Sequence, residues 1–257
     1  MPKRKDSPKA TLKSSDMKIN SPAFRSILER VHIQGLIDEC LLQVSESNGY
    51  VSAVDMTNSV LLAASQAGLG LNDDKYGISK LGTLVKFLGT CQDEDLAYSI
   101  DKDEKWLTIR RKGHGKIKVL LLEPEMVGTK LEEDPDVDGL IEGYEFQVTL
   151  STSFLTDALF YINLIGSQAV QFTVRGKRAF FTSVGNEVQQ FEVPIGTVEK
   201  GDGDTATQVY SDQVKSVLNT ITIEENSSLY IKGDHPIIFM QDMENFWALT
   251  PILPMRV

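Results

Sequence analysis

The stretch that decides the fold of this chain is Ser21–Val31, which reads SPAFRSILERV. Its apolar side chains follow the spacing i, i+3, i+4 and i+7, and they are Phe24, Ile27, Leu28 and Val31. That spacing places all four on one face of an α-helix, which Ser21 and Pro22 are suited to cap and open. We therefore predict a short helix with one narrow apolar stripe, lying on a sheet with its other face in solvent.

The same helix pattern occurs three more times along the chain. Ser21 and Ser79 recur as Ser153 and Ser211, both at a sequence offset of 132, and the apolar quartets recur at offsets of 131 and 133. The three further quartets are Leu81, Leu84, Val85 and Leu88; Leu155, Ala158, Leu159 and Ile162; and Val214, Val217, Leu218 and Ile221. Two pairs of matching helices, separated by nearly the same distance in the sequence, indicate a duplicated domain.

Short apolar or alternating runs, separated by turn residues, lie between and after these helices and predict strands. In the first half they are Cys40–Ser45, Tyr50–Asp55, Val60–Ser65, Leu96–Ile100, Trp106–Arg110 and Ile117–Leu122. In the second half they are Phe146–Leu150, Ala169–Val174, Ala179–Val184, Gln190–Ile195, Ser228–Ile231 and Ile237–Gln241. We predict an α+β fold of two duplicated halves, each a helix, about three strands, a second helix and about three more strands, with the helices on one face of antiparallel sheets.

The composition limits the class of protein. With 257 residues, 41% of them hydrophobic, the chain can bury one ordinary core in each half. No apolar run reaches the length of a membrane span, and the N-terminus lacks a signal peptide, so we expect a soluble intracellular protein. Cys40 and Cys91 lie in or beside apolar segments without metal-binding spacing, and we interpret them as reduced core thiols.

The net charge of −10 is unevenly distributed. Residues 121–145 carry a net charge of −8, whereas residues 1–18 carry +4. We therefore expect a disordered basic tail (1–18), a first domain (19–122), an acidic connector (123–145) and a second domain (146–257). The tail, which includes Pro2-Lys3-Arg4-Lys5, can be a solubilising extension, a nonspecific phosphate-binding segment or a nuclear address.

Three stretches carry a resemblance to a known family. The segment Val51–Leu62, around Val54-Asp55, is similar to a segment of DNA sliding clamps of the proliferating-cell-nuclear-antigen type. Asp234–Phe239, followed by Trp247–Ile252, is similar to the closing strand and tail of that family. Together with the duplicated halves and the acidic connector, the resemblance covers Ile19–Pro254. Viral, phage, archaeal and eukaryotic origins all fit, with an intracellular location at replicating DNA.

The resemblance implies a noncatalytic ring that encircles double-stranded DNA as a processivity factor in DNA replication. A homotrimer would supply six similar units, whose helices line the central hole and meet phosphates without reading sequence. A member of a hetero-oligomeric ring is the alternative. The cations expected on these helices are Arg25, Arg30, Lys80, Lys86 and Lys215. The third helix has no basic residue and is expected to place Asp157 outward.

The resemblance also implies protein partners, namely DNA polymerase, other replication proteins and a clamp loader. In the family, partner peptides dock into an apolar pocket beside the connector, and acidic flanks would favour peptides with basic neighbours. The residues expected in this pocket are Val54, Val127, Leu131, Leu140, Pro236, Trp247 and Pro251.

Ring closure in the family pairs a strand of one half with a strand of the next subunit. The expected edges here are Lys116–Leu122 and Glu187–Ile195, whose opposite charges are consistent with pairing. Charges on exposed edges also serve simply to prevent aggregation. The expected interface residues are Lys116, Lys118, Val119, Leu121, Glu187, Gln189, Phe191 and Val193.

One motif favours a different class of protein. Asp134–Glu145 fits the D-x-[DN]-x-[DN]-G-x5-E calcium-loop pattern, but a predicted strand begins at Phe146, where the exit helix of an EF-hand would start. We assign no metal and no cofactor, and we keep a duplicated calcium-responsive regulatory protein without a ring as the alternative. The three histidines form no catalytic or metal motif, and phosphate-binding and dinucleotide glycine motifs are absent from the sequence, so we do not expect an enzyme.

Overall fold

The computed structural model describes residues 17–91, 95–101, 103–113, 115–131, 135–184, 190–221 and 227–255. The described first half contains β1 (Lys18–Asn20), α1 (Ser21–His32), η1 (Ile33–Gly35), β2 (Glu39–Ser45), β3 (Asn48–Val54), β4 (Leu61–Gln66), β5 (Asp74–Ser79), α2 (Leu81–Gly89), β6 (Asp95–Asp101), β7 (Trp106–Arg111) and β8 (Gly115–Leu122). The second half contains β9 (Phe146–Leu150), α4 (Phe154–Ile165), β10 (Ala169–Arg175), β11 (Arg178–Val184), β12 (Glu192–Lys200), β13 (Asp204–Tyr210), α5 (Ser211–Leu218), β14 (Ser227–Ile231), β15 (Ile237–Met243) and β16 (Phe246–Ile252).

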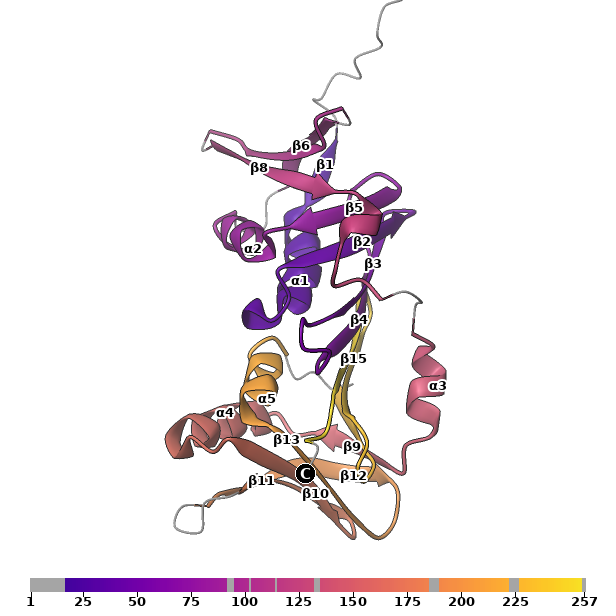
Figure 1. Ribbon diagram of the computed structural model, residues 1–257, viewed down its shortest axis with the longest axis vertical. Helices are drawn as coiled ribbons and strands as arrows, with labels where there is room; N and C mark the ends of the chain where they lie inside the picture. The colour runs from indigo at the N-terminus through magenta and orange to yellow at the C-terminus, as the bar shows by residue number, and fades with distance from the viewer. Residues whose placement is uncertain are drawn as a thin grey trace, which may run out of the picture.

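The two halves repeat one order of elements, which confirms the predicted duplication and the α+β class. Each half is a strand, a helix, four strands, a second helix and three strands. The strands β2, β3 and β5 have β10, β11 and β13 as counterparts, and all three pairs begin at the same sequence offset of 130. Figure 1 shows α1, α2, α4 and α5 on one side of the sheets, as the apolar stripes predicted.

The strand prediction missed β5 and β13, and it placed a tail where β16 is found. Gly77 in β5 and the polar run of β13 hide the alternation that marks a half-buried strand. Gly77 is required by the close approach of β5 to β8, because a Cβ at this position would overlap the carbonyl of Leu122. The helix cap of α1 also differs from the prediction. Asn20, rather than Ser21, is the N-cap, and its side chain accepts a hydrogen bond from the Ala23 N–H at 3.2 Å.

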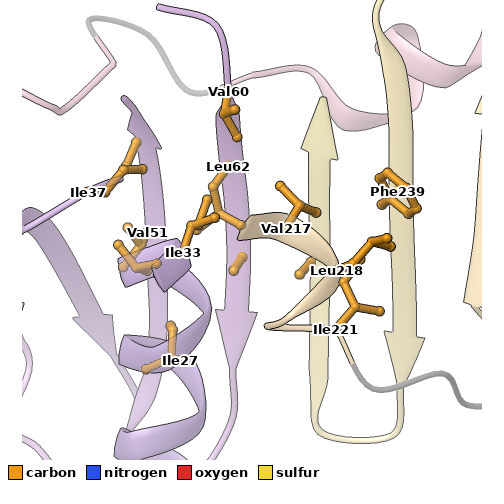
Figure 2. Close-up of a cluster of buried hydrophobic side chains, with 14 of the residues drawn as sticks. Ile27, Ile33, Ile37, Val51, Val60, Leu62, Val217, Leu218, Ile221 and Phe239 are labelled. Carbon is orange, nitrogen blue, oxygen red and sulfur yellow. The ribbon is translucent and has the colours of Figure 1, made fainter. Parts of the chain in front are cut away.

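All sixteen described strands follow one another in a continuous hydrogen-bonded order. Within this order β4 of the first half pairs antiparallel with β16 of the second half, from Gln66 opposite Phe246 to Ala63 opposite Leu249. The helices follow this junction: η1, which extends α1, contacts α5. Figure 2 shows Ile33 of η1 among apolar side chains that include Val217 and Leu218 of α5. The two halves therefore share both a sheet and a core.

The core of each half lies between the helices and the sheets. It contains the stripe residues Phe24, Ile27, Leu28 and Val31 in the first half and Phe154, Ala158 and Ile162 in the second. Cys40 and Cys91 are free and buried, and burial raises the pKa of the Cys40 thiol to about 12. Within the described residues, no helix has the length and apolar character needed to cross a membrane.

The connector between Leu122 and Phe146 runs on the side of the sheets opposite the four core helices (Figure 1). It contains η2 (Pro124–Met126) and a helix that the sequence reading did not predict, α3 (Val137–Glu142). The connector is bound to the first half, where the Val54 N–H donates to the Thr129 carbonyl at 2.8 Å and Lys130 forms a β-bridge with Ala53. At the other end of the chain, Lys18, assigned to the predicted tail, lies in β1 opposite Ala97.

Candidate nucleic-acid and partner interfaces

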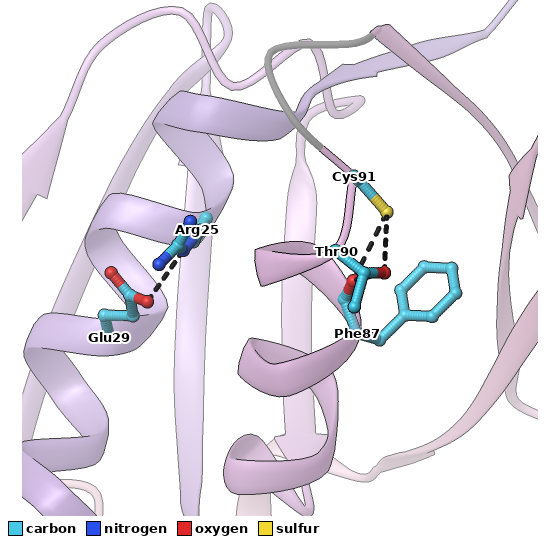
Figure 3. A network of polar contacts seen from close by, with 5 residues as sticks. All are labelled: Arg25, Glu29, Phe87, Thr90 and Cys91. Atoms are coloured by element: carbon cyan, nitrogen blue, oxygen red, sulfur yellow. Dashed lines mark hydrogen bonds and ion pairs between the residues drawn. The ribbon is translucent and has the colours of Figure 1, made fainter.

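Arg25 is an accessible cation of α1, but it is not free. Its Nε donates to Glu29 Oε1 at 2.7 Å, one helical turn away (Figure 3). Both side chains are less than half exposed, and the guanidinium also lies near Gly89 at the end of α2. Because an adjacent carboxylate offsets part of its charge, Arg25 is a weaker phosphate ligand than a free arginine.

Arg30 was predicted to project into solvent, and the structure corrects this. The side chain is 7% exposed and lies over the Phe246 ring, with Cζ 5.4 Å from the ring centroid. Burial lowers the pKa of Arg30 to about 10, against a smaller opposing effect of Glu29. The helical pattern placed Arg30 away from the apolar stripe of α1. That side of the helix is covered by the second half of the chain, which periodicity cannot reveal.

The three predicted lysines occupy different settings. Lys80 precedes α2 in a left-handed conformation, with Nζ 3.9 Å from Asp38 Oδ2. Lys86 on α2 is exposed and lines a cleft of about 550 Å³ together with His32 and Asn219. Lys215 on α5 is half-buried. Of these residues, only Lys86 combines a fully exposed position with a place on a helix.

His32 links this cleft to pH. Burial is the largest cause that lowers the pKa of His32, and the nearby charge of Lys86 lowers it further, while Asp38 acts in the opposite direction. The neutral imidazole is therefore favoured in the folded protein. The positive field of the cleft at neutral pH then comes from Lys86 and not from His32.

The helix α4 carries no basic side chain, as the sequence shows, and Asp157 on it is half-buried rather than fully outward. The exposed surface of α4 is apolar instead: Phe160 is 57% exposed and Leu164 is 62% exposed. The charge of the helical side of the molecule is consequently modest, because Glu29, Asp157 and Asp212 oppose the few cations.

The residues predicted for the partner pocket fall into two groups. In the first group, Val54 lines a cavity of about 580 Å³ with Met56, Leu36 and Leu122, beside the connector. Val127 of the connector is 2% exposed, so it supports this region from below rather than offering a contact surface. Met56, which the sequence reading missed, is 90% exposed. The available signal was an apolar residue inside a polar turn.

The turn that carries Met56 is built on Asp55. This carboxylate is 4% exposed and accepts hydrogen bonds from the backbone N–H groups of Thr57, Ser59 and Val60 at 3.1, 2.7 and 2.7 Å. Burial on its own would raise the pKa of Asp55, but the hydrogen bonds from Thr57, Val60 and Ser59 outweigh it and lower the pKa. Asp55 therefore fixes the loop between β3 and β4 and, with it, one wall of the cavity.

The second group surrounds Trp247. Its ring centroid lies 6.1 Å from that of Tyr50, and Val137 and Ile141 of α3 pack into the same small cluster. Pro236 accepts a 2.6 Å hydrogen bond from the Tyr144 hydroxyl, whose pKa burial raises to about 12.

The other members of the predicted pocket differ in exposure. Pro251 is buried, Leu131 is half-buried and Leu140 is 39% exposed. The seven predicted residues do not share the cavity that Val54 lines, because α3 covers part of the Trp247 surface.

The predicted ring edges are open in the structure. Within the described residues, β8 pairs along its length with β7 on one side, and only Leu121 and Leu122 pair with β5 on the other. Likewise Glu192–Pro194 of β12 pair only with β11. Lys118 lies over Trp106, with Nζ 5.9 Å from the ring centroid, and Lys116 is exposed on β8.

The apolar residues of these edges mostly point inward. Val119, Phe191 and Val193 are at most 6% exposed, and Leu121 is half-buried. Glu192 is paired with Arg175, whose Nη1 lies 3.2 Å from Oε2. Glu187 and Gln189 lie outside the described residues.

The calcium-like motif does not form a calcium loop in the described residues. Its central positions are helical in α3, and the Asp136 side chain caps that helix by accepting from the Gly139 N–H at 3.1 Å. Asp134 lies outside the described residues. In the part of the chain that the structure describes, no three His, Cys, Asp or Glu side chains are placed to hold a metal ion.

Comparisons with known proteins identify the fold. No protein-family model matches the chain, and neither does any curated protein sequence. PCNA from Thermococcus kodakaraensis is 14% identical and matches with a TM-score of 0.73 over 93% of this chain and 99% of its own. Proliferating Cellular Nuclear Antigen from Entamoeba histolytica is 16% identical, with a TM-score of 0.74 over 93% and 98% of the two chains.

Two further structures are complexes. The PCNA2–PCNA3 complex from Sulfolobus tokodaii matches with a TM-score of 0.71 at 15% identity, over 92% of this chain and 97% of that chain. A. fulgidus PCNA, bound to the C-terminal region of FEN-1, matches with a TM-score of 0.74 at 11% identity, over 94% and 98%. The chain therefore has the PCNA fold that the resemblance predicted.

Proposed function

We propose that this chain is a noncatalytic sliding clamp, which forms a closed ring around double-stranded DNA and tethers DNA polymerase and other replication proteins to it inside the cell. The observation that carries the proposal is the edge-to-edge junction β4–β16 inside the chain. The repeat provides equivalent edges on β12 and β8, and both are open. Copies of the chain can therefore join by the same pairing, and a ring of three copies closes the pattern.

The internal repeat also supplies the register of that contact. Ser52 and Thr182 are equivalent positions of the repeat and pair with Ala63 and Glu192, so Glu192 corresponds to Ala63. Similarly, Arg110 and Met240 are equivalent positions and pair with Lys116 and Leu249, so Lys116 corresponds to Leu249.

Ala63 pairs with Leu249 inside the chain. Lys116 should therefore stand opposite Glu192 of the next copy. An opposite-charge pair at this position favours the intended register by about 0.2–1 kcal/mol.

The DNA-facing surface in this proposal is the helical side of the sheets. Lys86, Arg25 and Lys215 supply its positive charge, and Arg30 does not. A small number of cations suits a protein held on DNA by topology, because contacts need only be weak and independent of sequence. We expect retention on DNA to depend on ring closure more than on affinity, and loading to require a clamp loader.

Partner peptides, in this proposal, bind on the opposite side, at the cavity of Val54 and Met56 beside the connector. Val127 and the Asp55 turn hold this cavity in shape. We retain residues 19–122, 123–145 and 146–257 as the proposed first domain, connector and second domain, and residues 1–18 as a proposed disordered tail.

Two measurements test the proposed function. Light scattering at micromolar concentration should give a mass near three times 28.5 kDa. After loading, the protein should stay on nicked circular DNA and slide off when the DNA is linearised, because only a topological link is lost on linearisation. A monomer that calcium stabilises would instead support a calcium-responsive regulatory protein, and equal loss from circular and linear DNA would contradict encirclement.

A further inference from the structure

The exposed part of α4 is an apolar face formed by Phe160 and Leu164. The two side chains are one helical turn apart, and they are 57% and 62% exposed. Neighbouring aromatic rings extend this surface into the core, since Phe160 packs edge-on against Tyr161, which stacks on Phe191 with centroids 5.6 Å apart. A rigid apolar face on a helix that should line a DNA channel has no phosphate to bind, and it indicates a protein contact.

The same position in the first half is covered. The stripe of α1 recurs in α4 at an offset of 131, so Leu164 corresponds to Ile33. Ile33 is 1% exposed, because its segment η1 contacts α5 of the second half (Figure 2). Inside the chain, the second half therefore buries the residue whose repeat is left exposed on α4.

The packing of helices on edge strands explains which surface would cover α4. In the chain, α1 packs on β4, α5 packs on β16, and pairing of β4 with β16 brings the two helices together. At the open edges, α4 packs on β12 and α2 packs on β8. Pairing of β12 with β8 of another copy therefore places α4 against α2 of that copy. Lys116 and Glu192 give these two edges complementary charges.

We propose that α4 is a subunit-contact helix, whose apolar face packs against the C-terminal end of α2 in a second copy of this chain. The inference rests on the proposed ring. The facing residues follow from the repeat: Val217 of α5 corresponds to Phe87 of α2, and Thr220 corresponds to Thr90, each at an offset of 130. Figure 3 shows Phe87 pointing away from α1, on the side of α2 left free by the first half.

A polar substitution tests the contact. Leu164→Asn should weaken the association of copies by about tenfold or more, so that the mass at micromolar concentration falls toward that of a monomer. Met56→Asn is the matched control, since Met56 is another exposed apolar side chain, and its mass should equal that of wild type. Because Leu164 is exposed, the circular dichroism spectrum and melting of the variant monomer should show an intact fold.

Crosslinking tests the geometry of the contact. Glu29 and Thr220 line one cleft inside the chain, and their repeats are Phe160 and Thr90. The double variant Phe160→Cys with Thr90→Cys should form covalent oligomers with a short bis-maleimide, whereas Phe160→Cys with Met56→Cys should not. A wild-type monomer would overturn both the ring and this contact. A wild-type trimer whose mass Leu164→Asn leaves unchanged, or which the first pair fails to crosslink, would overturn the α4 contact alone.

Discussion

Replacement of Arg30 by methionine should stabilise the protein and leave its retention on DNA unchanged. The guanidinium is 7% exposed, and burial lowers its pKa to about 10. One pKa unit corresponds to about 1.4 kcal/mol, so the lowered pKa represents a desolvation cost of about 3 kcal/mol for the charge. Methionine keeps an unbranched apolar stem and a high helix propensity, and it carries no charge.

The cost of the substitution is smaller than this gain. The contact between the Arg30 guanidinium and the Phe246 ring is lost, and such a contact contributes about 1–2 kcal/mol when it is desolvated. No partner hydrogen bond is broken at Nη1, which is buried without a hydrogen-bond partner among the described residues. The net expectation is a gain of about 1–2 kcal/mol in the free energy of unfolding.

Urea unfolding at neutral pH measures this difference, and salt-dependent retention on circular DNA measures the effect on binding. Arg25→Met is the matched control on the same helix, because its exposed ion pair with Glu29 should change stability by less than about 0.5 kcal/mol. Lys86→Met should weaken retention and lower its salt dependence. A loss of more than about 1 kcal/mol in Arg30→Met, or a loss of retention equal to that of Lys86→Met, would contradict the balance of energies given above.

The other predictions concern the turn, the ring edges and the pH response. Asp55→Asn should cost about 1–3 kcal/mol of stability, because buried backbone N–H groups lose a charged acceptor, and urea unfolding should show the cost at pH 7 but not below the folded pKa, which is lower than the ordinary value. Lys116→Glu should lower the fraction of ring in light scattering by repulsion from Glu192, and the double change with Glu192→Lys should recover part of it; no recovery would exclude the proposed register. The pKa of His32 is lowered in the folded state, so its contribution to stability should be complete above about pH 6.5 and decrease as the pH falls toward the folded pKa; His32→Gln should flatten this part of a melting-temperature profile, and a wild-type profile that is already flat would contradict the assignment.

The repeat, and the side of each helix that faces the core, could be predicted from the amino-acid sequence. A helix buries its apolar stripe whatever sheet it meets, so the spacing of Phe24, Ile27, Leu28 and Val31 predicted both α1 and its burial. The strands with clear alternation, such as Phe146–Leu150, were predicted for the same local reason. These features depend on residues that are neighbours in the chain.

The polar and apolar surfaces that remain available could be found only from the packing of distant segments. Arg30 is covered by the second half, and α3 covers Trp247, because segments distant in sequence pack there. Leu164 remains exposed although its repeat Ile33 is buried, since the chain supplies a second half to cover Ile33 and none to cover Leu164. Local periodicity describes one face of one element, whereas exposure depends on every element packed against it.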